Sequence, residues 1–216
     1  MKAVFRNYFS ALSNGAYLLL LLYAAAYPLV TAAHYARFIE LGPWLDLSPA
    51  LCWRGEIWRL VTYAFIPNGV IDWVVSLLWL TVMVGVLGRR WSSRELWTCG
   101  LIPILAGALV IVVLMSGRQK GIVGNAALVF GLLPAWYELS GRERITIPGI
   151  GGVRVRQAVL VMAMIEVLLS YLWLGWLATL AMMCGGGAGW GYLRWRRRQL
   201  LKDSGRLGER ERVRRL

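Results

Sequence analysis

Long apolar stretches alternate with short polar stretches along this chain. Each apolar stretch is close to the roughly 20 residues that an α-helix needs to cross about 30 Å of hydrocarbon. The stretches that fit this length are residues 15–36, 70–88, 95–115, 121–137, 157–173 and 176–193. The pattern predicts an all-α polytopic membrane protein, in which residues 15–193 form one bundle of six transmembrane helices.

The segments outside these spans differ in character. Residues 1–14 mix aromatic, polar and basic side chains, as expected of an interfacial lead-in, and residues 194–216 form a strongly basic tail. The longest connection, residues 37–69, is rich in tryptophan, which favours a loop that lies in the membrane interface and contains short helices. Residues 141–156 contain Pro-Gly and Gly-Gly pairs, which favour a small hairpin outside the membrane.

The composition agrees with a membrane protein. Of the 216 residues, 58% are hydrophobic and 16% are charged, whereas soluble domains average about 45–50% apolar and about 25% charged residues. The three cysteines, Cys52, Cys99 and Cys184, have neither the spacing of a metal site nor that of a disulfide framework. We therefore expect no metal ion, no cofactor and no soluble domain.

The net charge of +13 has two interpretations, nucleic-acid binding or membrane orientation. If six helices cross the membrane, 19 of the 24 lysines and arginines fall on the side that carries both termini. Because lysine and arginine are enriched on the cytoplasmic side of membrane proteins, both termini are predicted to be cytoplasmic. Arginines at the end of the last span, such as Arg194 and Arg198, then favour contact with anionic lipid headgroups over nucleic acid.

Two glycine-rich segments stand out among the spans. In the first, Gly121, Gly124 and Gly131 place small residues along one side of a predicted helix, where another helix can come close. In the second, Gly187 and Gly191 are spaced four residues apart. We therefore expect the fourth and sixth spans to pack tightly through these glycines.

Four motifs, which together cover the chain from the first span to the sixth, resemble the rhomboid family of intramembrane serine proteases. The family has a Trp-Arg pair in the loop after its first span, and Trp58-Arg59 lies in that place. The fourth span of the family begins Gly-x-Ser-Gly and has a further glycine seven residues on. Gly121, Gly124 and Gly131 fit that frame.

The other two motifs lie in the sixth and second spans. The sixth span of the family reads His-x-x-Gly-x-x-x-Gly, a spacing that Cys184, Gly187 and Gly191 match. Its second span begins with a His-x4-His-x3-Asn pattern, whose second and third places hold Asp72 and Ser76 in this chain.

The resemblance implies a rhomboid-like fold without the family's chemistry. The catalytic serine of the family corresponds to Val123, its histidine base to Cys184, and the groups that help to hold the oxyanion to Asp72 and Ser76. Peptide hydrolysis needs a nucleophile, a base within hydrogen-bond reach and donors for the tetrahedral anion. Since a valine methyl cannot attack a carbonyl, we expect an inactive pseudoprotease in which Val123 faces Cys184 in an apolar contact.

Inactive relatives of rhomboids are associated with binding transmembrane segments of other proteins, and the resemblance implies that role here. The expected partners are the lipid bilayer and the transmembrane helices of client proteins, and not nucleic acid. Glu166 lies in the middle of the fifth span, where a carboxyl is costly. It is interpreted as a polar contact for a client or a proton relay, or as a neutral or hydrogen-bonded acid.

Two polar residues near the outer side have structural interpretations as well. Arg59 is expected to organise the loop after the first span, with Glu56 as its partner three residues earlier. Asp72 is expected to be a solvated or capping carboxylate at the start of the second span.

Two other functions stay open on the sequence. An active peptidase would use Cys184 as its nucleophile and His34, the single histidine, as its base. A small carrier would place Glu166 in a translocation path. The compact chain, which has no transit-like presequence, favours a bacterial inner membrane.

Overall fold

The computed structural model describes residues 13–36, 40–116, 121–141, 143–147 and 151–214. Within these residues, the helices that are long and apolar enough to cross a membrane are α2 (Asn14–Tyr35), α6 (Val70–Arg90), α7 (Ser93–Leu114) and the Val155–Leu172 part of α9 (Val155–Leu174). All four lie close to the limits predicted from the sequence. The expectation of a helical membrane protein is therefore confirmed.

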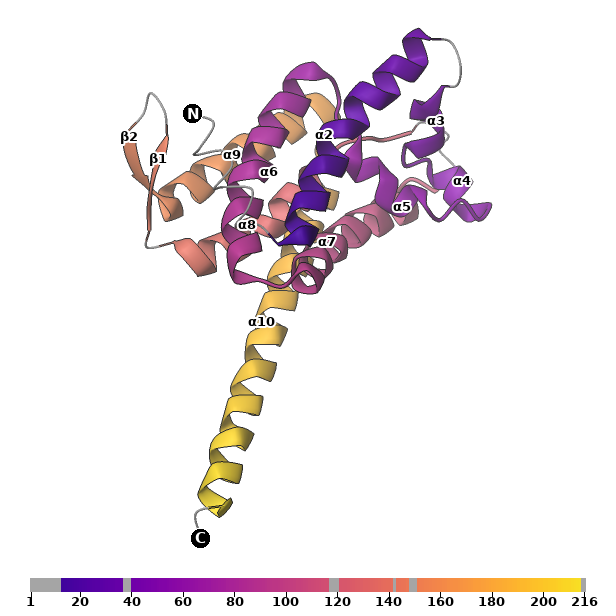
Figure 1. Cartoon of the computed structure of the whole chain (residues 1–216). Helices are drawn as coiled ribbons and strands as arrows, with labels where there is room; N and C mark the ends of the chain where they lie inside the picture. The colour runs from indigo at the N-terminus through magenta and orange to yellow at the C-terminus, as the bar shows by residue number, and fades with distance from the viewer. Residues whose placement is uncertain (1–12, 37–39, 117–120, 142, 148–150, 215–216) are drawn as a thin grey trace.

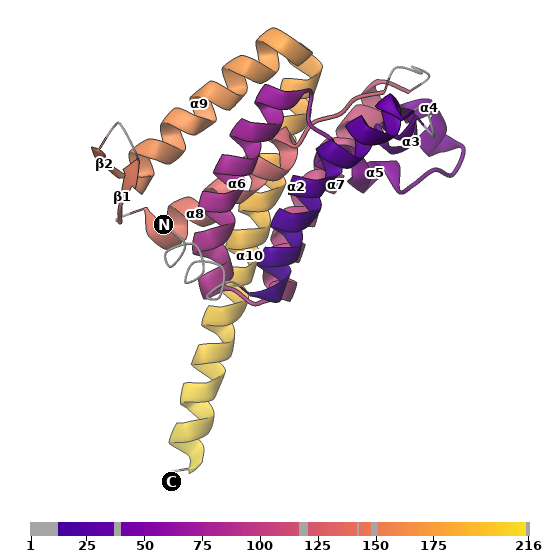
Figure 2. The same cartoon turned by 45° about the horizontal axis from the view of Figure 1, so that its top comes forward.

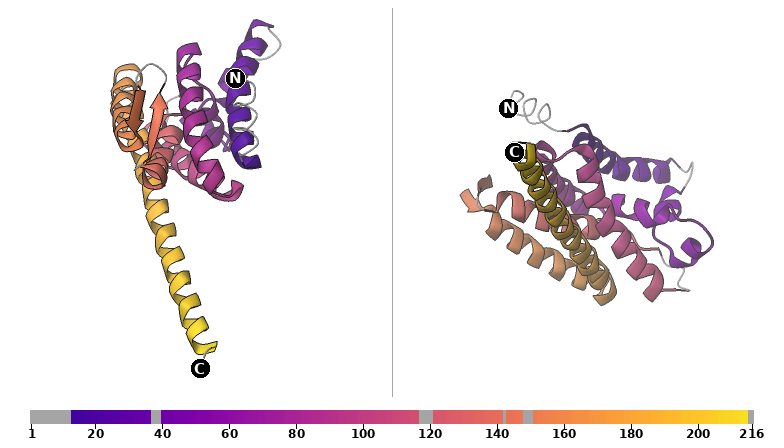
Figure 3. Two further views of the ribbon diagram at one scale, coloured as in Figure 1. Left: turned by 60° about the vertical axis from the view of Figure 1, so that its left-hand side comes forward. Right: turned by 90° about the horizontal axis from the view of Figure 1, so that it is seen from below.

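Two further helices complete the bundle. The apolar helix α8 (Ala126–Ser140) is shorter, and α10 (Trp176–Arg214) is the longest helix of the described chain. α10 continues well beyond the other helices (Figure 1 and the left view of Figure 3). That all six helices cross the membrane stays a prediction.

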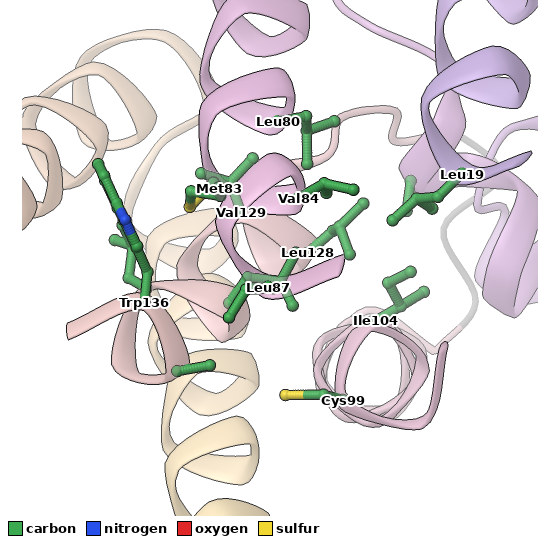
Figure 4. Close-up of a cluster of buried hydrophobic side chains, with 14 of the residues drawn as sticks. Leu19, Leu80, Met83, Val84, Leu87, Cys99, Ile104, Leu128, Val129 and Trp136 are labelled. Atoms are coloured by element: carbon green, nitrogen blue, oxygen red, sulfur yellow. The ribbon is translucent and has the colours of Figure 1, made fainter. Parts of the chain in front are cut away.

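Helix α8 lies at the centre of the bundle, in contact with α6, α7, α9 and α10 (Figure 2). Its side chains Leu128, Leu132 and Trp136 are fully buried. They belong to the same core as Leu87 of α6 and Ile104 of α7 (Figure 4). Because lipid tails are as apolar as these side chains, close packing and polar contacts, and not the hydrophobic effect, hold such helices together.

The connection between α2 and α6 carries short helices at one end of the bundle. They are α3 (Leu41–Leu45), α4 (Pro49–Trp53), α5 (Arg59–Thr62) and the 3-10 helix η1 (Tyr63–Phe65). Helices α4 and α5 pack against α7, and α3 packs against α2. We refer to residues 40–69 as the outer loop.

The opposite end of the bundle gathers the start of α2, the start of α7 and the middle of α10. The Gly15 N–H donates to Ser93 Oγ at 2.9 Å. Arg196 of α10 forms an ion pair with Glu95 in the first turn of α7. The basic segment of α10 therefore lies at the same end as the beginning of the first span.

The hairpin predicted between the fourth and fifth spans is present. Strand β1 (Arg144–Ile147) pairs antiparallel with β2 (Gly151–Arg154). Next to it, Arg90 at the end of α6 forms an ion pair with Glu143. The basic ends of α6 and α10 and the hairpin thus lie at one end of the bundle. The basic residues of the predicted lead-in, Lys2 and Arg6, lie outside the described residues, and the cytoplasmic orientation stays a prediction.

The fourth helix begins later than the sequence predicts. Residues 121–125 are not helical, because Ile122 exchanges two backbone hydrogen bonds with Leu47 of the outer loop, at 2.8 and 3.0 Å. Gly124 then has a φ of +135°, a backbone conformation that favours glycine. The helix therefore begins at Ala126, and the predicted start at residue 121 is wrong.

The sixth helix does not end at residue 193 but continues to Arg214. The predicted limit marked the point where the sequence turns polar, and a change of polarity does not by itself end a helix. Arginine, glutamate and leucine are frequent in the polar part, and all three are good helix formers.

Candidate functional site

The outer loop is built around the side chain of Arg59, which is only 2% exposed. Its Nη1 donates to Asp46 Oδ1 at 2.6 Å and to the Pro43 carbonyl at 2.7 Å, and its Nε donates to Glu56 Oε2 at 2.7 Å. Such partners are needed because an unpaired buried charge is strongly destabilising. The structure thus gives Arg59 the partner that the sequence suggested, Glu56, and adds Asp46.

The neighbouring tryptophan also closes the outer loop. Trp58 Nε1 donates to the Trp44 carbonyl at 3.2 Å. Burial raises the pKa of the Asp46 carboxyl, and the Arg59 guanidinium beside it opposes this shift. The Trp58-Arg59 pair therefore stabilises the folded conformation of the outer loop through these hydrogen bonds.

The outer loop in turn holds the extended segment that precedes α8. Leu47, next to Asp46 in the chain, makes the two backbone hydrogen bonds to Ile122. A Cβ atom on Gly121 would lie 1.7 Å from Asp46 Oδ2. Gly121 is therefore required by its contact with the loop, and its predicted role in helix–helix packing is wrong because it lies outside the helix.

A small cavity of about 30 Å³ lies at the beginning of α8. Val123 and Gly124 line it from the extended segment, and Met182 lines it from α10. Met182 is 1% exposed, whereas Cys184 is an exposed residue. The predicted contact between Val123 and Cys184 is therefore wrong, and Met182 lies in that place.

The glycines of α10 that pack against the backbone of neighbouring helices are Gly185 and Gly189, whereas Gly186 packs against the ring of Phe130. A Cβ atom on Gly185 would lie 2.9 Å from a backbone oxygen of α7, and one on Gly189 would lie 2.5 Å from the carbonyl oxygen of Gly131. A Cβ atom on Gly187 or on Gly191 would meet nothing within 4 Å. Gly131 thus has the packing role that the sequence assigns to it, and the role predicted for Gly187 and Gly191 is wrong.

The reason for this error is that two motifs of equal spacing overlap in α10. One begins at Cys184 and the other at Met182, and each is followed by glycines three and seven residues on. A shift of two residues turns a helix by about 200°, which moves the motif to nearly the opposite face. Spacing cannot distinguish the two motifs, and the contacts of α10 select the one that begins at Met182.

The described side chains that line this cavity form no pair of a nucleophile and a base. Val123 and Met182 offer methyl and thioether groups, which can neither attack a carbonyl nor accept a proton from a nucleophile. The Ser170 hydroxyl also lines the cavity, and its oxygen accepts a hydrogen bond from the Thr179 hydroxyl at 3.3 Å. The single histidine, His34, lies on α2 and lines a separate pocket of about 370 Å³.

A polar cluster adjoins the cavity between α2, α6 and α8. Asn68 Nδ2 donates to the Val123 carbonyl at 3.2 Å, and the Asn68 N–H donates to Asp72 Oδ2 at 2.8 Å. The Ser76 hydroxyl lies 3.1 Å from Asp72 Oδ1 and 3.2 Å from Asn125 Oδ1. Asp72 thus lies in the first turn of α6, accepts a hydrogen bond from the residue before the N-cap and belongs to the cluster.

The Tyr23 hydroxyl, on a side chain that is 0% exposed, lies beside the Ser76 hydroxyl. Asn125 Nδ2 is buried without a hydrogen-bond partner in the part of the chain that the structure describes. In addition, a serine hydroxyl has one proton, so Ser76 cannot donate to Asp72 and Asn125 at once. The cluster therefore has more hydrogen-bonding capacity than its own side chains use.

Glu166 of α9 is a partly buried carboxyl within an apolar helix. It shares one helix face with Met162 and Ser170, which precede and follow it by four residues and are 2% and 5% exposed. Within the described ranges, Glu166 makes no hydrogen bond or ion pair of its own.

Asp72 of α6 is the carboxyl of the hydrogen-bonded cluster, and Glu166 is the carboxyl of α9. We define the intramembrane polar site as Tyr23, Asp72, Ser76, Asn125 and Glu166. The sequence pointed to Asp72, Ser76 and Glu166, and it missed Tyr23 and Asn125. Tyr23 is a polar side chain inside an apolar span, and Asn125 directly precedes an apolar helix, so both had a signal that a search for polar residues in the spans would find.

A family model with the description "Eukaryotic integral membrane protein (DUF1751)" matches residues 15–211. A search of the curated proteins finds no match. The family description agrees with the apolar helices of the structure. It names eukaryotes, so the bacterial inner membrane expected from the sequence stays a prediction without support. Because the match covers most of the sequence, the chain belongs to this family of integral membrane proteins.

Proposed function

We propose that this protein is a rhomboid-like membrane protein, with six spans and cytoplasmic termini, that binds transmembrane segments of other proteins without cleaving them. The observation that carries the proposal is the polar cluster of Asp72, Ser76 and Asn125, which is joined by hydrogen bonds between α6 and the start of α8. It adjoins a cavity whose lining includes Val123 and Met182.

The absence of cleavage follows from the groups at that cavity. In the rhomboid frame, Val123 stands in the place of the serine. Because Gly185 and Gly189 are the glycines of α10 that pack against neighbouring backbone, Met182 and not Cys184 stands in the place of the histidine. Neither side chain has the chemistry of a nucleophile or a base, and the Asp72 carboxylate would oppose a developing oxyanion.

The binding role is supported by the polarity of the site and by the apolar surface around it. Polar groups inside a membrane are costly when unpaired, and they attract polar groups of other helices. Val75 of α6 and Ile165 of α9, next to Ser76 and Glu166 in the chain, are 41% and 48% exposed. A client helix with a polar residue at mid-span would satisfy the site and cover this apolar surface.

The two alternatives have less support. A peptidase based on Cys184 lacks a base, because the single histidine lies on α2 in a separate pocket. A carrier is favoured by the unpaired carboxyl of Glu166 alone. It predicts ion or solute flux in liposomes that disappears in Glu166→Gln.

A binding assay in vesicles tests the proposal. The full chain is reconstituted with a transmembrane peptide that carries asparagine at mid-span and a photo-crosslinker beside it. The peptide is expected to crosslink and to be recovered at full length. The variant Asp72→Leu with Glu166→Leu is expected to lose most of the crosslinking, whereas Glu138→Leu, at an exposed position of α8, is expected to retain it.

Two outcomes would count against the proposal. Recovery of a cut peptide would show that the protein is a protease. Equal crosslinking of the natural chain and the double variant would show that the intramembrane polar site does not bind the peptide.

A further inference from the structure

The distal part of α10 is a helix that leaves the bundle. Arg196 forms an ion pair with Glu95, and its guanidinium lies 5.6 Å from the centre of the Trp91 ring, so α10 is held at the beginning of α7. The helix then continues without a break to Arg214. Figure 1 shows this yellow part clear of the other helices, and the left view of Figure 3 agrees. We refer to residues 197–214 as the stalk.

Basic residues recur at every fourth position along this part of α10. They are Arg194, Arg198, Lys202, Arg206, Arg210 and Arg214, and we refer to them as the basic ridge. Residues at this spacing lie along one ridge of an α-helix, about 6 Å from one another along its axis. The other rows of the same spacing all contain apolar or acidic residues. The basic ridge is therefore confined to one side of the stalk.

The basic ridge is unfavourable for the helix that carries it. Its neighbouring charges are closer than the screening length of about 8 Å at physiological salt, and like charges four residues apart destabilise a helix. Gly205 and Gly208 lie in the stalk, and only proline is a weaker helix former than glycine. Helices in proteins owe most of their stability to packing against other elements. An anionic partner along the ridge would therefore stabilise the stalk.

Anionic lipid headgroups reach only the beginning of the basic ridge when α10 crosses the membrane, as proposed above. The headgroup layer on each side of a bilayer is about 5–8 Å thick. The helix from Arg194 to Arg214 is about 30 Å long, and α10 runs along the bundle and not across it (Figure 2). Arg194 and Arg198 thus meet the headgroups, and the rest of the ridge stands beyond them in water.

The composition of the stalk favours a protein partner over a nucleic acid. Asp203, Glu209 and Glu211 lie among its basic residues and would repel phosphates. The sequence of the stalk contains no aromatic residue on which a base would stack. Leu201 and Leu207 lie in the two rows on either side of the ridge, where another helix would find apolar positions.

We propose that the basic ridge of α10 binds an acidic helix of another protein, in which carboxylates recur every four residues. Such a row matches the spacing of the basic residues over the turns in contact, and it removes the repulsion along the ridge. The inference rests on the six-span topology of the proposed function and not on client binding, because the ridge lies outside the bundle.

Four probes test this assignment on the full chain in nanodiscs of neutral lipid. They are two alanine-rich helical peptides with glutamate or lysine at every fourth position, a single-stranded oligonucleotide with as many negative charges as the glutamate peptide, and vesicles of anionic lipid. Fluorescence anisotropy measures binding of the first three, and flotation measures binding to the vesicles. The glutamate peptide is expected to bind, and more weakly as salt rises, because the charges are exposed.

Two variants of equal net charge separate the basic ridge from overall charge. Arg206→Gln with Arg210→Gln removes two neighbouring charges of the ridge, and Arg197→Gln with Arg212→Gln removes two charges from other rows of the stalk. Glutamine is a good helix former, so neither change disfavours the helix. From the usual strength of two exposed ion pairs, the first variant should bind the glutamate peptide about fivefold more weakly. The second should lose less than about twofold.

The outcomes also separate this inference from the proposed function. Equal binding of the glutamate and lysine peptides, or equal losses in the two variants, would overturn the inference. Ridge-dependent binding of the oligonucleotide or of the anionic vesicles that exceeds binding of the glutamate peptide would overturn it as well. The ridge variant should still capture the transmembrane peptide with a central asparagine. Failure of the natural chain to capture that peptide would overturn client binding and leave a ridge that binds the glutamate peptide in place.

Discussion

Gly189 of α10 lies directly against the backbone carbonyl of Gly131 in α8, so that a Cβ atom on Gly189 would be 2.5 Å from that oxygen. This contact fixes which face of α10 meets the central helix. It therefore also brings Met182, on the same face of α10, to the cavity that Val123 lines.

Alanine at Gly189 is predicted to destabilise the protein, although alanine is the better helix former. The methyl would meet backbone, which cannot move aside easily, and such overpacking typically costs about 1–3 kcal/mol. Gly187→Ala is the matched control, because a Cβ atom there meets nothing within 4 Å. The free energy of unfolding in detergent is measured for the two purified variants and for the natural chain. Equal stability of the two variants would contradict the packing of α10 described here.

Restoring a serine and a histidine should reveal which residue of α10 faces Val123. Val123→Ser with Met182→His is predicted to react with a fluorophosphonate probe, because both positions line one cavity. Val123→Ser with Cys184→His is predicted to stay unreactive, since residue 184 is exposed. If the probe labels the Val123→Ser, Cys184→His variant and not the Val123→Ser, Met182→His variant, Cys184 and not Met182 faces Val123, and the packing of α10 described here is wrong.

Loss of the Arg59 side chain should loosen the outer loop. In Arg59→Gln, Asp46 and Glu56 lose their cation, and breaking a buried ion pair typically costs about 3–5 kcal/mol. Arg54→Gln, at an exposed position of the same loop, should change stability by no more than about 0.5 kcal/mol. Thermal unfolding compares the stability of the two variants. In Arg59→Gln, amide exchange at Leu47 and Ile122 should also be faster than in the natural chain. Similar unfolding of both variants would rule out Arg59 as the organiser of the loop.

The hairpin should become less protected in acid. The hydrogen bond from Arg90 lowers the pKa of Glu143 below its ordinary value of about 4.5. An acid whose pKa is lowered by folding stabilises the fold above the ordinary value, and this contribution is lost as the pH falls through the lowered value. The rate of amide exchange in β1 and β2 of the natural chain is divided by the rate in Glu143→Gln at the same pH. This ratio should therefore rise as the pH falls below about 4.5 and through the lowered pKa of Glu143. A ratio that does not change with pH would mean that the Arg90–Glu143 pair does not hold the hairpin.

Hydrophobic length predicted most of the fold, because the membrane requires helices of nearly fixed length. It failed at residues 121–125, where backbone hydrogen bonds to Leu47 keep the segment extended. That partner is distant in sequence and follows no spacing rule. The end of α10 was missed for another reason, since a change of polarity does not end a helix.

The candidate site was predicted in part. Asp72 and Glu166 were visible as acidic residues in apolar segments, and such residues are rare in membranes. Met182 was not distinguishable from Cys184, because both begin the same glycine spacing. The partnership of Arg59 with Asp46 was not visible at all, since it depends on how the loop folds back.

The most direct test of the account is to locate the client on the surface of the protein. A photo-crosslinking amino acid is placed at Val75 of α6, at Ile165 of α9 or at Val113 of α7, all exposed positions. The natural chain is predicted to capture an intact transmembrane peptide with a central asparagine from positions 75 and 165, and not from position 113. Equal capture from all three positions, or capture of a cut peptide, would contradict a non-cleaving client site between α6 and α9.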